Sequence, residues 1–230
     1  MQGFASGQIL HSKFIDLPLP NIKMCVLMMI FFRCFAVATA SILGLFSLHA
    51  TPLPVDDAWP MVGTAGHGHT YPGATFPFGS VQLSPDTRTG GWDACSGYNY
   101  VDTNIMGFSH THLSGTGGAD LGEVMIIPFM GDTDRTNFES TFSHDNEFAT
   151  PGYYRVHLDT YGIEAELTAT AHCGLHRYTF PKSKDSHILI DLVHGIGDRP
   201  PAGAELKMEN DHTITGKRVD RGWTQKTIYF

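Results

Sequence analysis

Apolar and polar residues alternate regularly in the second half of the chain. The alternation runs from Tyr153 to Leu158, pauses at residues 160–162 (Thr-Tyr-Gly), and resumes from Ile163 to Ala169. Successive side chains of a β-strand point to opposite faces, so a period of two marks a strand with one buried face. Two such strands joined by a short turn that contains a glycine predict a β-hairpin.

Further strands are predicted where apolar runs or alternation recur. The predicted ranges are 76–83, 105–112, 123–130, 176–180 and 187–193, with short strands around Leu206, Ile214 and Ile228. The runs 123–130 and 187–193 are apolar enough for burial on both faces. The Ser-Pro-Asp sequence at 84–86 is expected to end the first strand, and the polar stretches 131–152 and 195–204 are expected to be loops.

After the first 50 residues, no segment shows the apolar stripe and end signals of an amphipathic helix. Strands that recur about every eight to twelve residues predict an all-β fold, either a sandwich or a barrel. The final residues 227–230 read as a strand with no turn after it. This favours a fragment of a longer polypeptide.

The N-terminal 50 residues have the pattern of a secretory signal peptide. Lys23 and Arg33 precede an apolar or small run from Cys34 to Leu48, and Ala50 offers a small residue for cleavage. The alternative is a signal anchor over residues 24–48, although Arg33 interrupts it. We therefore expect an N-terminal extension with a signal peptide (1–50), a single domain (51–230), and a secreted or periplasmic/extracellular product. Residues 1–23 lack a pattern, so the start codon is open between Met1 and Met24.

The charge of the remaining domain limits the choice of partners. Removing Lys13, Asp16, Lys23 and Arg33 leaves 12 basic and 22 acidic residues, a net charge of −10. A strongly acidic domain is a poor partner for nucleic acid and has no basic patch for anionic lipids. A neutral ligand such as a sugar is compatible with this charge.

Two cysteines, Cys95 and Cys173, remain after removal of the signal peptide. They could pair in an oxidising compartment, or they could be two unpaired, half-buried thiols. The sequence leaves both alternatives open.

Residues 63–122 are rich in glycine and contain two His-x-His pairs, His67/His69 and His110/His112. Glycine at this density indicates tight turns or a backbone that approaches a ligand closely. In a strand, His110 and His112 would face the same side and could share a metal ion. However, His67 and His69 lie in an expected loop with no evident Asp, Glu or Cys as third ligand. No metal site is therefore predicted, and hydrogen bonding to loops or to a ligand is favoured.

Trp92 and Asp93 are the best candidates for binding chemistry. An indole ring covers the apolar face of a sugar while a neighbouring carboxylate accepts from hydroxyl groups. The alternative is that Trp92 packs over the end of the fold as a core residue.

The glycines at 115–118 lack the Lys-Ser/Thr and helix of a phosphate-binding loop. No catalytic group stands out: there is no Gly-x-Ser-x-Gly elbow, and the candidate carboxylates read as turn or surface residues (Asp86, Asp93, Asp120 and Glu123).

Four segments carry a specific family resemblance. They read GTAGHGHTYPGATFPFG (63–79), QLSPDTR (82–88), GWDACSGY (91–98) and GFSHTHLSGTG (107–117). Later segments fit in the same order, among them FSHDNE (142–147) and HRYTFP (176–181). Together they closely resemble the N-terminal domain of glycoside hydrolase family 92, over nearly all of residues 55–230.

This resemblance implies a secreted exo-α-mannosidase that trims N-glycans and related mannans. It also implies inversion of configuration and a requirement for calcium. The implied architecture is an N-terminal antiparallel β-sandwich, a galactose-mutarotase-like supersandwich with long glycine-rich loops, followed by a catalytic (α/α)6 barrel. The general acid, the general base and the main calcium ligands are then expected in the barrel, beyond this chain.

For this chain, the resemblance implies a part of the substrate-binding cleft that is inactive alone. The expected partners are a mannose-containing glycan and the missing barrel of the same polypeptide, and no nucleic acid. No catalytic residue and no metal ligand is expected here, and the expected substrate-binding residues are His67, His69, Trp92, Asp93, Cys95 and His112. The alternatives are a stand-alone carbohydrate-binding module and, less favoured, a histidine-ligated metalloenzyme.

Overall fold

A computed structural model describes residues 53–223 and 225–230 of the chain. The predicted signal peptide, its anchor alternative and the choice of start codon all concern residues outside this part. Within the described residues, no helix is both long and apolar enough to cross a membrane. The short helices there are 3-10 turns: η1 (Pro54–Asp57), η2 (Trp92–Ala94) and η3 (His144–Asn146).

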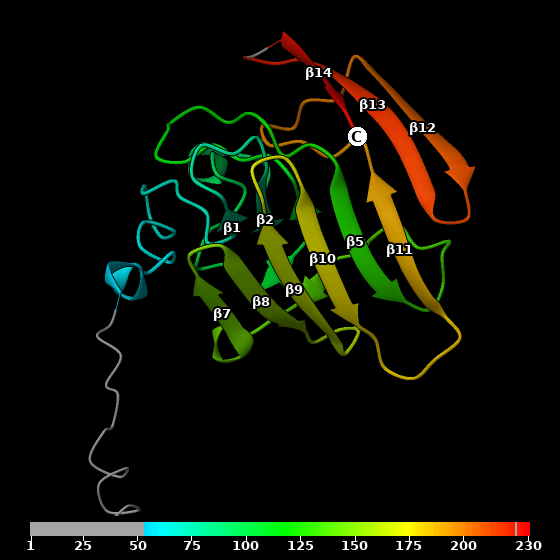
Figure 1. The fold of residues 1–230 in the computed structure, drawn as a ribbon, viewed down its shortest axis with the longest axis horizontal. Coiled ribbons are helices and arrows are strands. Elements are labelled where there is room, and N and C mark those ends of the chain that lie inside the picture. Colours follow the sequence, from blue (N-terminus) through cyan, green and yellow to red (C-terminus); the bar gives the residue numbers. More distant parts are fainter. Residues whose placement is uncertain (1–52, 224) are drawn as a thin grey trace, which may run out of the picture. The chain divides into compact units, whose positions relative to one another are not determined.

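Two antiparallel sheets pack face to face (Figure 1). The first has the order β1-β2-β4-β5-β11 and consists of β1 (Ala74–Thr75), β2 (Gln82–Asp86), β4 (Gly107–Ser109), β5 (Met125–Met130) and β11 (Ser186–Asp191). The second has the order β10-β9-β8-β7 and consists of β7 (Glu147–Thr150), β8 (Tyr153–Leu158), β9 (Ile163–Ala169) and β10 (Gly174–Thr179). The predicted all-β sandwich is thereby confirmed.

Two smaller sheets accompany the sandwich. β12 (Gly203–Asn210), β13 (Thr213–Arg221) and β14 (Gln225–Tyr229) form a three-stranded sheet at the C-terminal end of the chain, and β3 (Asn104–Ile105) pairs with β6 (Ser140–Thr141). The strands predicted around Leu206, Ile214 and Ile228 are present and longer than expected.

The core lies between the two main sheets. Tyr154 and Val156 of β8 and Ile163 of β9 are fully buried, together with Leu83 of β2 and Phe108 of β4. Each of these residues sits at an inward position of its strand, which is why the alternation in the sequence was visible. The predicted hairpin is confirmed in register, with Leu158 opposite Ile163.

The first predicted strand is shifted. Residues 76–80 form a turn in which Phe78 has a φ of 61° and an exposed side chain, and strand β2 begins only at Gln82. β2 also continues through Pro85, which was expected to end it. Beyond Leu83, β2 pairs with β4 alone, so Pro85 needs no backbone donor on its other side.

Three other predictions need correction. The expected strand 105–112 is divided between β3 and β4, so His110 and His112 do not share one face of a strand. The expected loop 131–152 contains strands β6 and β7. The strand predicted at 187–193 is β11, which ends at Asp191. Its expected burial on both faces is wrong, because Ile188 is 55% exposed on a face that no described element covers.

Candidate functional site

The first His-x-His pair lies in a turn whose shape is fixed by glycines. His69 has a φ of 54°, which is unusual for a residue with a side chain. A Cβ on Gly68 would lie 2.1 Å from the Gly63 carbonyl oxygen, so only glycine fits between the two histidines. The carbonyl of His69 accepts from the Gly115 amide at 2.7 Å. The turn is therefore held from two sides before any ligand binds.

Asp93 joins the two histidines into one cluster. Its Oδ1 accepts from His67 Nδ1 at 2.6 Å and from His69 Nε2 at 3.2 Å. The hydrogen bond from His67, and then that from His69, hold the pKa of Asp93 below its usual value. The sequence interpretation found no third ligand near this pair, because Asp93 is 24 and 26 residues away along the chain.

Trp92 stands beside this cluster with an open face. Its side chain is 60% exposed, and its ring meets that of His69 edge-on at 5.2 Å. Gly117 lies against the ring, since a Cβ there would come within 2.5 Å of it. Trp92 is therefore a surface residue packed on a neighbouring loop, and the alternative of a core tryptophan does not describe this structure.

A buried charged network lies beneath these loops. Asp86 at the end of β2 is fully buried and bonded by His112 Nε2 and His194 Nε2, each at 2.8 Å. Burial alone raises the pKa of Asp86, but the two imidazoles outweigh it and hold the pKa well below its usual value. His112 Nδ1 donates to the Gln82 carbonyl at 2.7 Å. The imidazole of His112 is thus committed to the interior of the protein.

Cys95 is also an interior residue. Its side chain is buried, its Sγ donates to the Trp92 carbonyl at 2.9 Å, and burial raises the pKa of the thiol. Cys173 is exposed and both thiols are free, so the unpaired alternative holds. Of the six expected substrate-binding residues, the structure brings four into one cluster (His67, His69, Trp92 and Asp93). Within that cluster His69 is buried, and Cys95 and His112 are buried outside it.

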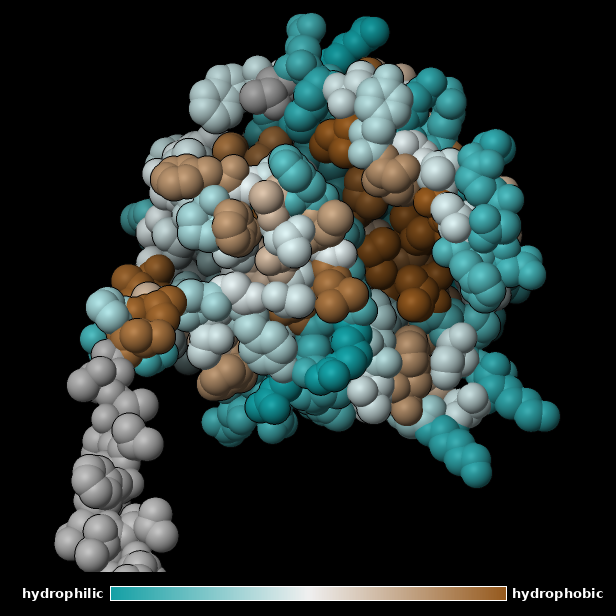
Figure 2. All heavy atoms as spheres, in the orientation of Figure 1, coloured by the Kyte–Doolittle hydropathy of each residue, from teal (hydrophilic) through white to brown (hydrophobic). Residues whose placement is uncertain are grey.

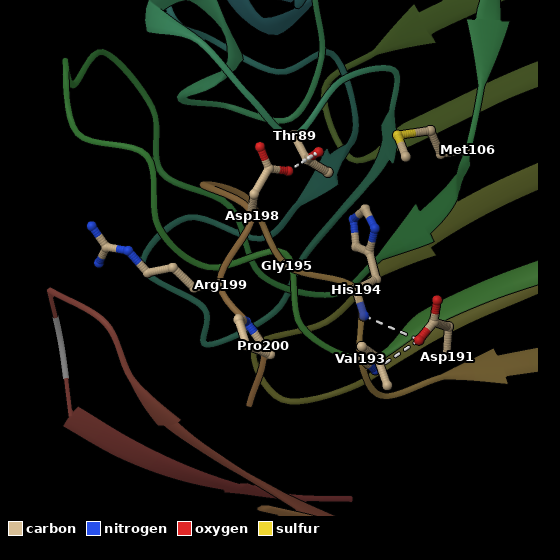
Figure 3. Close-up of a pocket in the computed structure, with 9 residues that line it drawn as sticks. All are labelled: Thr89, Met106, Asp191, Val193, His194, Gly195, Asp198, Arg199 and Pro200. Carbon is tan, nitrogen blue, oxygen red and sulfur yellow. Dashed lines mark hydrogen bonds between the residues drawn. The ribbon is translucent and has the colours of Figure 1, made fainter. Parts of the chain in front are cut away.

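A hollow of about 320 Å³ lies between Thr89, Met106 and the segment from Asp191 to Pro200 (Figure 3). Asp198 has a φ of 54° and accepts from the hydroxyl of Thr89, while Asp191 accepts the backbone N–H groups of Val193 and His194. Asp198 and His194 were not singled out from the sequence. The available signal was the glycine-containing loop expected at 195–204, which follows the strand β11 after three residues.

A second cavity is larger and is lined mainly by hydrophobic side chains. About 690 Å³ in volume, it is hollowed among hydrophobic residues of β5, β10, β11 and the C-terminal sheet (Figure 2). We call this cavity the apolar groove; its hydrophobic lining includes Val81, Val124, Ile126, Tyr178, Ile188, Ile190, Ile214, Ile228, Tyr229 and Phe230.

The two histidines of the second His-x-His pair have different surroundings: His112 belongs to the Asp86 network, whereas His110 lines the apolar groove. His110 donates from Nδ1 to the Val124 carbonyl at 2.6 Å, and its Nε2 lies 3.0 Å from His176 Nε2. His176 Nδ1 accepts from the Tyr178 hydroxyl at 2.7 Å. Burial lowers the pKa of His110, and burial followed by the charge of His110 lowers that of His176 to about 3. Both histidines are neutral lining residues of the apolar groove.

Calcium does not fit the cluster of His67, His69 and Asp93. Calcium takes about six to eight oxygen ligands, whereas this cluster offers two imidazoles and one carboxylate. Within residues 53–223 and 225–230, it is the single group in which three His, Cys, Asp or Glu side chains bring their ligand atoms within 4.8 Å of one another. The calcium ligands implied by the resemblance remain expected outside this chain.

The model of the glycosyl hydrolase family 92 N-terminal domain matches residues 59–230. The chain therefore belongs to this family. Solved structures agree: a family 92 α-mannosidase from Bacteroides thetaiotaomicron, determined in complex with mannoimidazole, is 43% identical with a TM-score of 0.73. That match covers 76% of this chain and 24% of the mannosidase.

Two further relatives extend the comparison. An inverting mannosidase of family 92 from the same bacterium is 26% identical, with a TM-score of 0.59 over 75% of this chain and 24% of its own. A protein described as an uncharacterized secreted glycosidase from Arthroderma benhamiae is 34% identical over 162 residues, which is 64% of this chain and 20% of that protein. The family 92 chain thus spans between a fifth and a quarter of the length of these relatives.

Proposed function

We propose that this chain forms one wall of the glycan-binding cleft of a secreted, calcium-dependent, inverting α-mannosidase that acts on N-glycans or mannans. The observation that carries the proposal is the exposed face of Trp92 beside the carboxylate of Asp93, on loops fixed by glycine contacts. An aromatic face with an adjacent acceptor suits the apolar and hydroxyl sides of a sugar ring.

In this proposal Trp92 stacks on the sugar ring and Asp93 accepts from its hydroxyl groups. His67 and the buried His69 hold the Asp93 carboxylate in place, and two more residues support this surface from below. Cys95 holds the Trp92 carbonyl from below, and His112 fixes the end of β2 through Asp86.

The catalytic acid and base belong, in this proposal, to the remainder of the polypeptide. An inverting glycosidase places two carboxyl groups about 6.5–9.5 Å apart with water between them. We assign neither role to this chain, since Asp86 is bonded by two histidines in the interior and Asp93 by two at the surface. The chain by itself is therefore inactive, and its secretion follows from the predicted signal peptide.

The apolar groove is where we place the contact with the rest of the polypeptide. The relatives are about four times as long as the matched region, and the last residue of this chain, Phe230, lines the groove. β10 and β11, one edge strand from each of the two main sheets, both contribute to it. A following segment that enters here can pair with an open edge and cover exposed apolar side chains.

Hydrolysis of an α-mannobioside tests the proposed function. The full-length polypeptide, extended beyond Phe230, should release mannose in the presence of calcium and lose this activity after calcium is removed. The 230-residue chain should release none under either condition. Robust release by the 230-residue chain would overturn the proposal that the catalytic groups lie outside this chain. If the longer polypeptide bound mannose without hydrolysing the substrate, a carbohydrate-binding module would be favoured instead.

A further inference from the structure

We propose that His67, His69 and Asp93 form a binding site for a divalent transition-metal ion such as Zn²⁺. The three ligand atoms already converge: Asp93 Oδ1 lies 2.6 Å from His67 Nδ1 and 3.2 Å from His69 Nε2, and all three atoms lie within 4.8 Å of one another. In a tetrahedral zinc site with bonds of about 2.0–2.1 Å, neighbouring ligand atoms are separated by about 3.3–3.4 Å. Small side-chain rotations therefore convert the hydrogen-bonded cluster into a coordination shell.

The backbone of the site is fixed in advance. His69 is held in a left-handed conformation, and Gly68 fits against Gly63 with no room for a side chain. The Gly115 amide bonds the His69 carbonyl from another loop. A turn held at both sides loses little conformational freedom when its side chains bind an ion, and such preorganisation favours affinity.

The donor set selects the class of ion. Imidazole nitrogen suits zinc, copper and nickel, whereas calcium and magnesium require mostly oxygen ligands. Two imidazoles and one carboxylate are therefore selective against calcium, the ion that the family resemblance implies for the catalytic half. The site proposed here is separate from that calcium site and depends on this chain alone.

The surroundings leave part of the ion open to solvent. His69 is 5% exposed and its ring lies against Trp92, whereas the side chain of His67 is 77% exposed. Three protein ligands leave at least one position of a four-coordinate ion for water or a ligand oxygen. Because His69, one of the three ligands, lies against Trp92, the ion would sit beside the proposed glycan contact.

Titration calorimetry of the whole protein tests the site. The protein is treated with a chelator, returned to buffer with excess calcium, and titrated with zinc chloride and then nickel chloride. We expect saturable binding of one ion per chain, with calcium unable to compete. His67→Gln and Asp93→Asn should each weaken binding by roughly tenfold or more, since even the indirect supports of a metal site carry that much.

Two controls keep the result specific. His172→Gln removes an exposed histidine from another part of the surface and should leave zinc binding unchanged. Circular dichroism and thermal melting should show that all variants remain folded. Absence of saturable binding in the parent protein, or equal binding by the parent, His67→Gln and Asp93→Asn, would overturn the proposal. Because binding rather than hydrolysis is read, this outcome is independent of the mannosidase test.

Discussion

Two regions of this domain handle histidine in opposite ways. In the glycine-rich loops and the network beneath them, carboxylates face the imidazoles: Asp93 joins His67 and His69, and Asp86 joins His112 and His194. In the apolar groove, His110 and His176 face each other and a tyrosine, with low pKa values.

His110 and His112 make the comparison direct. They are two residues apart, yet one lines the groove and the other belongs to the Asp86 network. The difference teaches that a His-x-His pattern does not define a site until the fold supplies the partners. Carboxylate partners hold histidines in polar networks, partly exposed around Asp93 and buried around Asp86, whereas apolar surroundings leave His110 and His176 as neutral lining residues of the groove.

The largest expected effect is at Asp86. Asp86→Asn removes the one charge that satisfies both His112 and His194 in the interior. Breaking a buried charged network of this kind costs about 3–5 kcal/mol of unfolding free energy. Denaturant unfolding monitored by circular dichroism measures the loss.

Asp93→Asn is the matched control, because Asp93 also bonds two histidines but does so at the surface. It should change the unfolding free energy far less than Asp86→Asn. Equal effects would show that burial does not separate the two clusters.

The apolar groove gives the next effect. In the full-length polypeptide, Ile188→Glu should lower the unfolding free energy by about 2–3 kcal/mol, because a charge would replace a covered apolar side chain. Leu175→Glu is the control, since Leu175 is 63% exposed but does not line the groove. Its effect should remain within about 0.5 kcal/mol.

Both residues are exposed in the present structure, so the comparison reports what covers the groove. Equal, small effects of Ile188→Glu and Leu175→Glu would mean that the groove stays open to water. An effect of Ile188→Glu that depends on protein concentration would identify a second copy as the occupant, rather than the following segment of the same polypeptide.

Trp92 tests the polar region by function rather than by stability. Trp92→Ala in the full-length polypeptide should cost roughly 1–3 kcal/mol of transition-state stabilisation, from the lost sugar contact. Thermal melting should hardly change, because the ring is mostly exposed. Trp59→Ala, another exposed tryptophan, should alter neither quantity. A large fall in melting temperature with unchanged activity would identify Trp92 as a packing residue.

The sequence predicted the parts of this fold that depend on local pattern. The hairpin of β8 and β9 is visible because its inward residues alternate along the chain, and its partners lie only a few residues away. The strand expected at 76–83 was misplaced because Phe-Pro-Phe is apolar without being buried, and Phe78 is fully exposed in a turn. Apolar residues at a surface turn give the same local signal as a strand.

The residues of the site could be predicted from the sequence, but the hydrogen bonds between them could not. Trp92 and Asp93 were recognisable from their neighbours and from the family resemblance. Asp86 and His194 are 108 residues apart, and no spacing rule joins them. Their contact depends on the loop after β11 returning to the end of β2, which is decided by packing of the whole sandwich. The same holds for Asp93, which the turn at η2 places against the His67 turn.

The smallest expected effects are in the pH dependence of stability, and they differ in sign between the two regions. Burial and the neighbouring His110 lower the pKa of His176 to about 3. Between about pH 6.5 and pH 3, the His176 side chain is therefore protonated in the unfolded chain but neutral in the folded protein. This contribution therefore reduces stability as the pH falls. Burial lowers the pKa of His194, but Asp86 outweighs it and the net pKa is raised, so its contribution is present below about pH 6.5 and is lost as the pH rises through the folded value.

Unfolding free energies measured in small pH steps separate the two histidines. Between about pH 5 and 6.5, where most carboxylates are ionised, His176→Gln should flatten the decline of stability on acidification by at most about 1.4 kcal/mol per pH unit. His194→Gln should instead flatten the decline above about pH 6.5. His212, exposed in the turn after β12, supplies the control variant His212→Gln, which should follow the parent protein in both ranges. If the stability of His176→Gln fell with pH below about pH 6.5 as steeply as that of the parent protein, the groove would not hold His176 neutral. The proposed contrast between the histidines of the two regions would then be wrong.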